Sequence, residues 1–181
     1  MSWKKYGAIR RKPSWRRNLE FETGLKDKRP MQITIAAVGR MKSSPAAQQW
    51  QDYAKRLTWP VTLKEVEMRK KLPASQMVLG EAELLSAAVP GDALLVALDP
   101  GGKSLSSEDF AAQMQRWMSD GQSQFAFVIG GAGGLAGALV AGAGFKLSLS
   151  KMTWPHMLAR VMLIEQLYRA QCILTKHPYH R

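Results

Sequence analysis

Two short apolar runs constrain the fold of this chain more than any other feature. They read DALLVALD (residues 92–99) and FAFVIG (residues 125–130) and are almost free of polar side chains. A strand that is buried on both faces reads as a continuous apolar run, whereas a half-exposed strand alternates between apolar and polar residues. Both runs are therefore predicted to be inner strands of a parallel sheet with helices on both faces.

The segments around these runs alternate as a parallel α/β sheet requires. Further strands are predicted at 32–38, 61–67 and 145–150. Helices are predicted at 45–57, 77–89, from Ser106 or Ser107 to about 119, at 135–141 and at 156–174. Because ligands bind beyond the carboxyl ends of the strands in this fold class, the loops that follow the strands are the places to look for function.

Length, charge and cysteine content narrow the class of protein. A chain of 181 residues is long enough for one domain with a substantial core. It has no apolar run of the roughly 18 residues that a membrane helix needs, so we do not expect a membrane protein. Lys and Arg outnumber Asp and Glu by 26 to 14, which indicates a polyanionic partner, foremost nucleic acid. The single cysteine, Cys172, cannot form an internal disulfide, which is typical of the cytoplasm.

Residues 1–30 differ in composition from the rest of the chain. They hold ten Lys and Arg against three acids, a net of +7, interleaved with Trp3, Tyr6 and Trp15. Such a mixture can follow a phosphate backbone and stack on bases. We favour a flexible leader or an unused upstream start, because Met31 opens the first predicted strand. We therefore predict a basic extension over 1–30 and one domain over 31–181.

The stretch ALDPGGKS (residues 97–104) imitates a phosphate-binding P-loop. Ala97 stands where the first glycine of that motif belongs, and the helix capped by Ser106 or Ser107 starts too late for its N–H groups to face a phosphate. We therefore interpret the stretch as a plain turn with an exposed Lys103.

The turn GGAGG after the strand at 125–130 fits the spacing of a dinucleotide-binding turn. That motif needs an acid about twenty residues later to hold a ribose, and no acid lies between Asp120 and Glu165. Bare glycine backbone still allows a ligand to approach closely. The turn is a candidate ligand site rather than a dinucleotide site.

The loop KMTWPH and the helix behind it form another candidate. Pro155 suits the start of a helix and restricts Trp154 to extended geometry, so the loop is pinned where it enters the helix. On one side of the helix lie Leu158, Val161, Met162, Glu165, Arg169 and Cys172. Glu165 and Arg169 are either an ordinary i,i+4 ion pair or part of an interface or active site.

The tail reads HPYHR. Cys172, His177 and His180 make a poor zinc signature, so no metal site is expected. A frayed terminus is one interpretation of these residues. The other is that an aromatic side chain between two histidines, beside an arginine, stacks on a base and contacts phosphate.

Several of these stretches resemble one family, the bacterial ribosomal RNA large-subunit methyltransferases H, which methylate N3 of a pseudouridine in 23S ribosomal RNA. The stretches are FVIGGAGGL, LSLSKMTWPHMLARVMLIEQLYRA, HPYHR, MQITIAAVGRMK and LDPGGKSLSSEDFA. The resemblance covers residues 31–181. One departure is that Ala132 and Gly133 stand where relatives usually carry Pro or Ser and then an acidic or amide residue.

The resemblance implies a SPOUT-type α/β fold with a C-terminal trefoil knot, a homodimer, and S-adenosylmethionine as the methyl donor. The partner that it implies is large-subunit ribosomal RNA, within the ribosome. The cofactor contacts that it implies are Leu98, Gly130, Gly131, Leu149, Ser150, Lys151, Met152, Thr153 and Trp154.

For catalysis we hypothesise that His156 or His180 assists removal of the N3 proton. Tyr179 would stack on or orient the base, while Arg160 and Arg169, the latter with Glu165 beside it, would hold phosphate or an enolate-like oxygen. Two alternatives stay open. One is a SPOUT methyltransferase acting on another RNA nucleotide, and the other is a ribosome-associated RNA-binding protein that has lost catalysis.

Overall fold

The computed structural model describes residues 31–69 and 72–180. The predicted basic extension, with its aromatic residues, lies outside the described residues, as does Arg181. The division into an extension and a domain therefore stays a prediction.

Five strands and five helices alternate along the described chain. The strands are β1 (Gln32–Val38), β2 (Val61–Val66), β3 (Leu94–Ser104), β4 (Gln124–Ile129) and β5 (Phe145–Ser148). The helices are α2 (Pro45–Arg56), α3 (Ala74–Ala88), α4 (Ser107–Ser119), α5 (Gly137–Ala141) and α6 (His156–Leu174). Each predicted strand and helix is present, and the predicted bounds of the last helix agree with those of α6.

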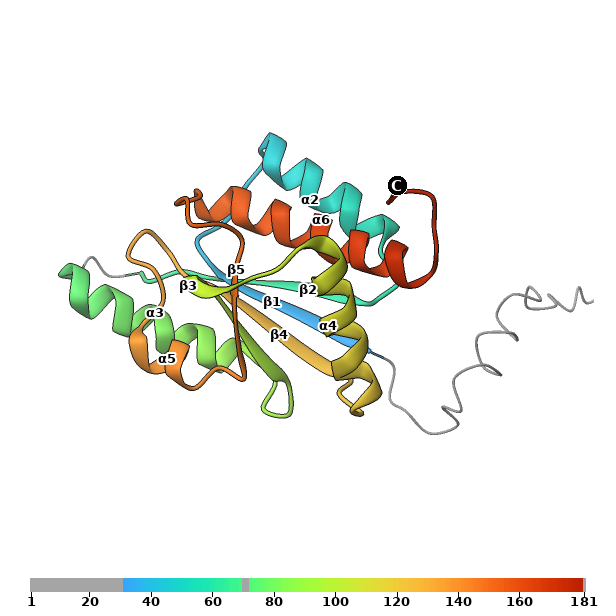
Figure 1. Cartoon of the computed structure of the whole chain (residues 1–181). Helices are drawn as coiled ribbons and strands as arrows, with labels where there is room; N and C mark the ends of the chain where they lie inside the picture. Colours follow the sequence, from blue (N-terminus) through green and yellow to red (C-terminus); the bar gives the residue numbers. More distant parts are fainter. Residues whose placement is uncertain (1–30, 70–71, 181) are drawn as a thin grey trace, which may run out of the picture.

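The strands form one sheet in the order β2-β1-β4-β3-β5, and every pair is parallel. In Figure 1 all the strands consequently present their carboxyl ends to the same edge. The parallel α/β architecture expected from the two apolar runs is confirmed.

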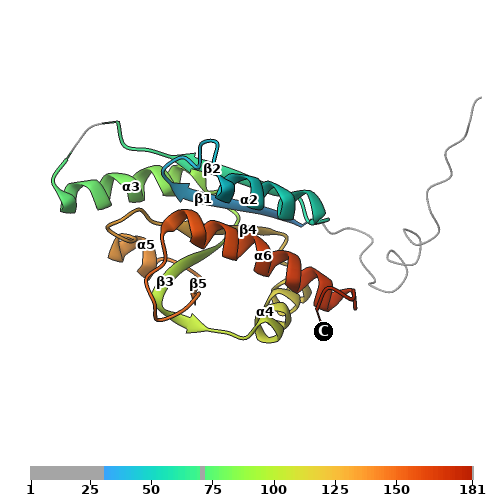
Figure 2. The same ribbon diagram turned by 90° about the horizontal axis from the view of Figure 1, so that it is seen from above.

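Helices cover both faces of the sheet. Helices α2 and α6 lie on one face, and α3 and α5 lie on the other (Figure 1). Viewed from above, α6 runs between α2 and α4 (Figure 2). The larger core lies under these three helices and includes Phe125 and Phe127 of β4 with Leu163 and Leu167 of α6. Because α6 is central to this layer, its first turns are held rigidly above the carboxyl edge of the sheet.

The stretch Asp99–Ser104 is not the plain turn that its sequence predicts. Strand β3 continues through it to Ser104, and after an irregularity beyond Leu98 the chain pairs again with β5, with Lys103 opposite Leu147. A Cβ at Gly102 would lie 2.7 Å from the backbone of Lys146, so a glycine is needed for the two strands to approach this closely. Leu98 and Lys103 both lie opposite Leu147, so the four residues between them bulge out of the pairing with β5, and the strand resumes at Lys103.

The helix face singled out in the sequence is not the one that enters the core. The most deeply buried residues of α6 include Leu163, Ile164 and Leu167. Leu158 is 43% exposed, and Glu165 and Arg169 are half-buried. Cys172 is the member of the predicted set that is fully buried. One side of α6 therefore keeps apolar and charged groups near the surface.

Candidate functional site

A pocket opens at the carboxyl edge of the sheet, where the segments that follow Leu98 in β3, β4 and β5 converge. Its walls are mostly apolar, with backbone of the glycine turn on one side. The lining residues are Leu98, Asp99, Pro100, Ile129, Gly130, Gly131, Ala132, Gly134, Leu135, Leu147, Leu149, Ser150, Met152, Thr153, Trp154, His156 and Ala159. This is the position that the topology of a parallel sheet predicts for a ligand.

Two glycines of the turn are required by its geometry. Gly134 has φ +77° and its N–H donates to the carbonyl of Gly131 at 3.1 Å. A Cβ at Gly130 would lie 2.5 Å from the carbonyl of Gly134, so any larger residue would collide with the backbone. The turn therefore folds tightly on itself and presents main chain, rather than side chains, to the pocket.

All the predicted cofactor contacts except Lys151 line this one pocket. The side chain of Lys151 is exposed and is not part of the wall. Within the loop, the Ser148 hydroxyl donates to the Ser150 carbonyl at 3.0 Å, and the Met152 N–H donates to the Ser150 hydroxyl at 2.9 Å. These bonds shape residues 148–152 into a compact turn that ends at the pocket wall.

Arg160 lies beneath this edge and is buried, with none of its side chain exposed. Its Nη1 donates to Glu65 Oε1 at 2.8 Å, and its Nη2 donates to the carbonyls of Val38 and Gly39. Desolvation lowers the pKa of the guanidinium, and Glu65 opposes that effect. The role expected for Arg160 in holding phosphate does not fit this placement, because its fork is occupied by protein groups.

His156 is the first residue of α6 and lines the pocket. Burial lowers the pKa of its imidazole, and the positive charge of Arg160 lowers that pKa further. The neutral form is therefore favoured near pH 7, and a neutral imidazole can accept a proton.

A second group of predicted residues gathers where the tail folds back on α6. The Tyr179 hydroxyl donates to Glu165 Oε1 at 3.0 Å, and Arg169 Nε donates to the same oxygen at 2.9 Å. The Arg169 guanidinium also lies over the Tyr179 ring, 4.9 Å from its centroid. The Glu165–Arg169 pair is therefore part of a larger cluster and not an isolated surface ion pair.

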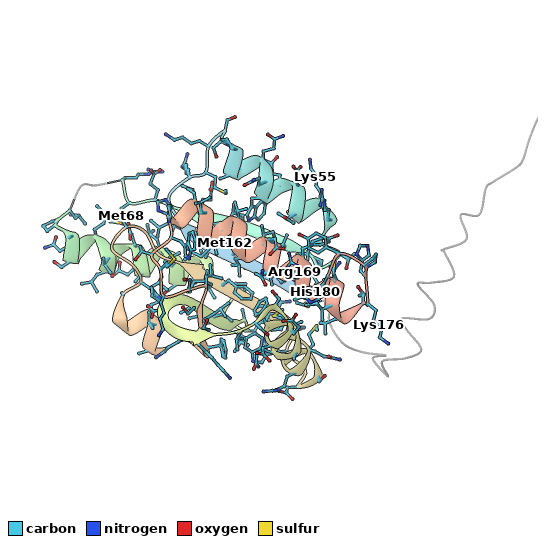
Figure 3. The ribbon with its side chains drawn as sticks, turned by 45° about the horizontal axis from the view of Figure 1, so that its top comes forward. Lys55, Met68, Met162, Arg169, Lys176 and His180 are labelled. Atoms are coloured by element: carbon cyan, nitrogen blue, oxygen red, sulfur yellow. The ribbon has the colours of Figure 1, made fainter. Side chains whose placement is uncertain are left out.

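His180 joins the same cluster (Figure 3). Its Nδ1 lies 3.4 Å from Arg169 Nη1, and its Nε2 lies 2.8 Å from Glu108 Oε1 of α4. A neutral imidazole with its proton on Nε2 satisfies both contacts, because Nδ1 then accepts and Nε2 donates. In this arrangement both ring nitrogens of His180 face protein groups.

The electrostatics of the tail cluster follow from its contacts. Burial, with the Tyr53 and Glu165 hydrogen bonds, raises the pKa of the Tyr179 phenol. The hydrogen bond to Glu165 raises the pKa of Arg169. Tyr179 therefore remains protonated as a donor, and Arg169 keeps its charge.

The pocket and the tail cluster lie on two sides of β5. A second cavity is lined by Tyr53, Glu165 and the N-terminal end of α4, and Leu147 and Leu149 line both cavities. His156 lies with the first group, and Arg169, Tyr179 and His180 lie with the second. The structure therefore gathers the predicted site residues into two adjacent groups within one chain.

Sequence reasoning missed several residues of these two groups. Asp99 lines the pocket, and its only signal is its place at the end of an apolar run. Tyr53 and Glu108 contact the tail from α2 and α4, and Glu65 holds Arg160 from β2. No local pattern marks these three, because their partners lie far away in the chain.

The described parts of the chain also bear on metals and membranes. Among residues 31–69 and 72–180 no three His, Cys, Asp or Glu side chains are grouped so that they could hold a metal ion. No helix within the same ranges is long and apolar enough to cross a membrane.

Comparison with known proteins gives consistent matches. The family model described as "Predicted SPOUT methyltransferase" matches residues 31–180. Ribosomal RNA large subunit methyltransferase H of Rhodospirillum centenum is 51% identical over 151 residues, which cover 83% of this chain and 99% of the relative. The protein of the same name from Paramagnetospirillum magneticum is 47% identical with the same coverage.

Among solved structures, a probable methyltransferase from Bordetella pertussis matches with a TM-score of 0.49 and 13% identity, over 78% of this chain and 96% of that one. The family assignment rests on the sequence matches, which span nearly the whole of each relative. By the range matched and the identity to these relatives, the chain belongs to the SPOUT methyltransferase family, among the ribosomal RNA large subunit methyltransferases H.

Proposed function

We propose that this protein uses S-adenosylmethionine to methylate N3 of a pseudouridine in large-subunit (23S) ribosomal RNA, in the cytoplasm and within the ribosome. One observation carries the proposal. All the predicted cofactor contacts except Lys151, drawn from three separate segments of sequence, line one pocket at the carboxyl edge of the sheet. The names of the relatives, which are large-subunit ribosomal RNA methyltransferases, support the choice of RNA. The net charge of +12 supports a polyanionic partner.

The pocket fits the proposed cofactor. Its apolar wall, which includes Leu98, Leu149 and Trp154, suits a flat adenine ring, and the turn at Gly130 and Gly131 offers main-chain groups for polar contacts. A larger residue at Gly130 would collide with the turn itself, so the bare backbone is built into the site. When bound, the cofactor supplies an electrophilic methyl group.

The acceptor nitrogen must lose its proton to become a good nucleophile, and His156 is the better placed of the two predicted bases. It lines the pocket, and burial keeps its imidazole neutral and able to accept a proton. Both nitrogens of His180 are occupied, by Arg169 and Glu108. A positioned base of this kind contributes roughly 10²- to 10⁴-fold to a rate.

The tail cluster is assigned to the substrate. The Tyr179 ring stacks on or orients the target base, and Arg169 holds a phosphate or an enolate-like oxygen. Arg169 is half-buried and its charge is secured by Glu165, so it can approach a polyanion without losing its proton. We assign Arg160 to positioning instead, because it is buried and ties α6 to the end of β1.

We also propose a homodimer that pairs through α6. Leu158 is 43% exposed and Met152 is 68% exposed, and both lie at the start of α6 or just before it. Exposed apolar side chains of this kind favour an interface. Two-fold pairing would bring the tail cluster of one subunit to the pocket of its partner, so that each composite site draws on both subunits.

The C-terminal trefoil knot belongs to the same proposal. Its support is the strand order, in which β5 lies at the edge of the sheet next to β3 while α6 returns over β1 and β4. The loop between β5 and α6 lines the pocket together with the turn after β4. In a knotted chain, the topology of the backbone would keep these two loops next to each other.

Calorimetric titration of the purified protein with S-adenosylmethionine tests the cofactor, and mapping of the methylated nucleotide in ribosomal RNA tests the substrate. Saturable binding together with a new N3 methyl group on a pseudouridine is the expected result. Binding with methylation elsewhere would point to a different RNA nucleotide. A folded protein that binds RNA but not the cofactor would be a non-catalytic RNA-binding protein.

A further inference from the structure

Glu81 of α3 lies against the glycine turn, although fifty residues separate it from Gly131 in the chain. A Cβ at Gly131 would lie 3.0 Å from Glu81 Oε2 and 3.1 Å from Oε1. Since a carbon–carbon bond is about 1.5 Å long, both carboxylate oxygens lie within about 4.6 Å of the Gly131 Cα. Both carboxylate oxygens therefore lie close to Gly131, which itself lines the pocket.

Among residues 31–69 and 72–180 no hydrogen bond or ion pair is formed by the Glu81 carboxylate. The other acid of this region, Asp99, accepts a hydrogen bond from the Gly101 N–H at 2.8 Å. Glu81 is half-buried, and desolvation raises the pKa of its carboxyl group. A carboxylate that has no donor among the described residues and lies beside a pocket is available to a cationic ligand.

Gly131 is the position that lets this carboxylate approach. A side chain there would meet Val38 Cγ1 at 3.0 Å as well as the two Glu81 oxygens. The neighbouring Gly133 is packed against the same helix, since its Cβ would lie 2.6 Å from Val78 Cγ2. Helix α3 therefore packs directly against the glycine turn. This packing places the negative charge of Glu81 next to the pocket.

We propose that Glu81 is a specificity-determining residue of this pocket, whose negative charge behind Gly131 favours a cationic ligand over a neutral one of the same shape. This inference rests on the proposed function. In methyl transfer from S-adenosylmethionine the sulfur–methyl bond breaks, the methyl group passes to nitrogen, and the sulfonium becomes the neutral thioether of S-adenosylhomocysteine. Glu81 therefore favours binding of the donor and release of the product.

The experiment is calorimetric titration of the full chain with S-adenosylmethionine and, separately, with S-adenosylhomocysteine. Glu81→Gln keeps the shape of the side chain and removes its charge. We expect this variant to bind the sulfonium compound about fivefold to tenfold more weakly and the thioether within about twofold of the unchanged protein, because only the former interacts as a cation. The control is Glu83→Gln, an exposed acid on the same helix, which should alter neither affinity.

A second variant keeps the test decisive if Glu81→Gln does not fold. Gly131→Ala pushes a methyl group against the carboxylate, and displacing the charge should reduce the preference for the sulfonium compound in the same direction. Equal losses for both compounds in folded Glu81→Gln would overturn the proposal, since Glu81 would then act on a feature that the two compounds share and not on the sulfonium. An unchanged preference would overturn it as well. If the unaltered protein binds neither compound, the proposed function itself fails, which is a different result.

Discussion

The buried Arg160 forms an ion pair with the partly exposed Glu65, 2.8 Å from Nη1 to Oε1, that joins the first turns of α6 to β2. The same carboxylate oxygen accepts the N–H of Met41 at 2.7 Å, and the Arg160 fork also binds the carbonyls at the end of β1. One guanidinium therefore fixes the carboxyl ends of two strands against the helix that carries His156. The geometry of the pocket depends on this connection.

Replacing Arg160 should strongly destabilise the fold. Arg160→Met removes the buried charge, leaves the carbonyls of Val38 and Gly39 without this donor and takes the cation away from Glu65, so we expect the free energy of unfolding to fall by about 3 kcal/mol. Urea denaturation measures this. The matched control is Arg40→Ala, which breaks an exposed pair with Glu67 and should cost less than about 1 kcal/mol. Equal effects of the two substitutions would contradict the assignment of Arg160 to positioning.

The stability of the protein should depend on the protonation of His156. Its pKa is lower in the folded protein than in the unfolded chain, so as the pH falls below the ordinary histidine value of 6.5 the unfolded state binds more protons. The free energy of unfolding should therefore fall as the pH drops through this region and should be recovered as it rises. Urea titrations between about pH 5 and 7.5 should show a smaller slope for His156→Gln than for the unaltered protein. The exposed His177, changed to Gln, serves as the control, and an unchanged slope in His156→Gln would rule out this contribution.

Substitutions of the two predicted bases, His156 and His180, should differ in their effect on turnover. His156→Gln should lower methyl transfer by roughly 10²-fold or more, because it removes the neutral imidazole at the pocket. His180→Ala should mainly weaken RNA binding, because its imidazole bridges Arg169 and Glu108 and orders the tail. Single-turnover rates at saturating RNA separate the two effects. If His180→Ala, and not His156→Gln, abolishes turnover under saturation, the assignment of the base must be reversed.

Replacing Gly102 or Gly137 with alanine should change the stability of the protein in opposite directions. A Cβ at Gly102 would lie 2.7 Å from the Lys146 backbone, so Gly102→Ala must push β3 and β5 apart and should cost about 1–3 kcal/mol. Gly137 begins α5 and has no atom within 4 Å of a Cβ, so Gly137→Ala should stabilise the protein by up to about 1 kcal/mol. Thermal and urea unfolding of both variants check this, and a stabilising Gly102→Ala would refute the close strand contact.

The proposed dimer should allow two inactive variants to rescue each other. A Gly130→Val variant should lack a working cofactor pocket, and a Tyr179→Ala variant should lack a working tail. If one subunit's tail serves its partner's pocket, mixed dimers contain one intact composite site. Random mixing in equal amounts should then restore about a quarter of the original activity. Mixtures that stay inactive despite exchange of subunits would show that each pocket uses its own tail.

Local periodicity was enough to predict most of the architecture. The apolar runs at 92–99 and 125–130 identified inner strands, and the start of α6 at His156 followed from the proline before it. Strands and helices are decided largely by which side chains recur at a spacing of two or of three to four residues, and that spacing is visible in one sequence. The loops at the carboxyl edge could be identified for the same reason, since the topology of a parallel sheet fixes where ligands bind.

Other features depended on contacts between distant parts of the chain. The sequence predicts Arg160 as a residue that holds phosphate or an enolate-like oxygen, and the stretch 97–104 as a plain turn. The contacts with Glu65 and the end of β1 instead make Arg160 a buried positioning residue, and pairing with β5 makes the stretch part of β3. Likewise, Glu81 meets Gly131 only because α3 packs across the back of the turn. The sequence by itself determined the order of the elements and the edge that carries the site. The tertiary structure decided which charges are buried and which face the pocket, because burial and pairing depend on neighbours that no local pattern specifies.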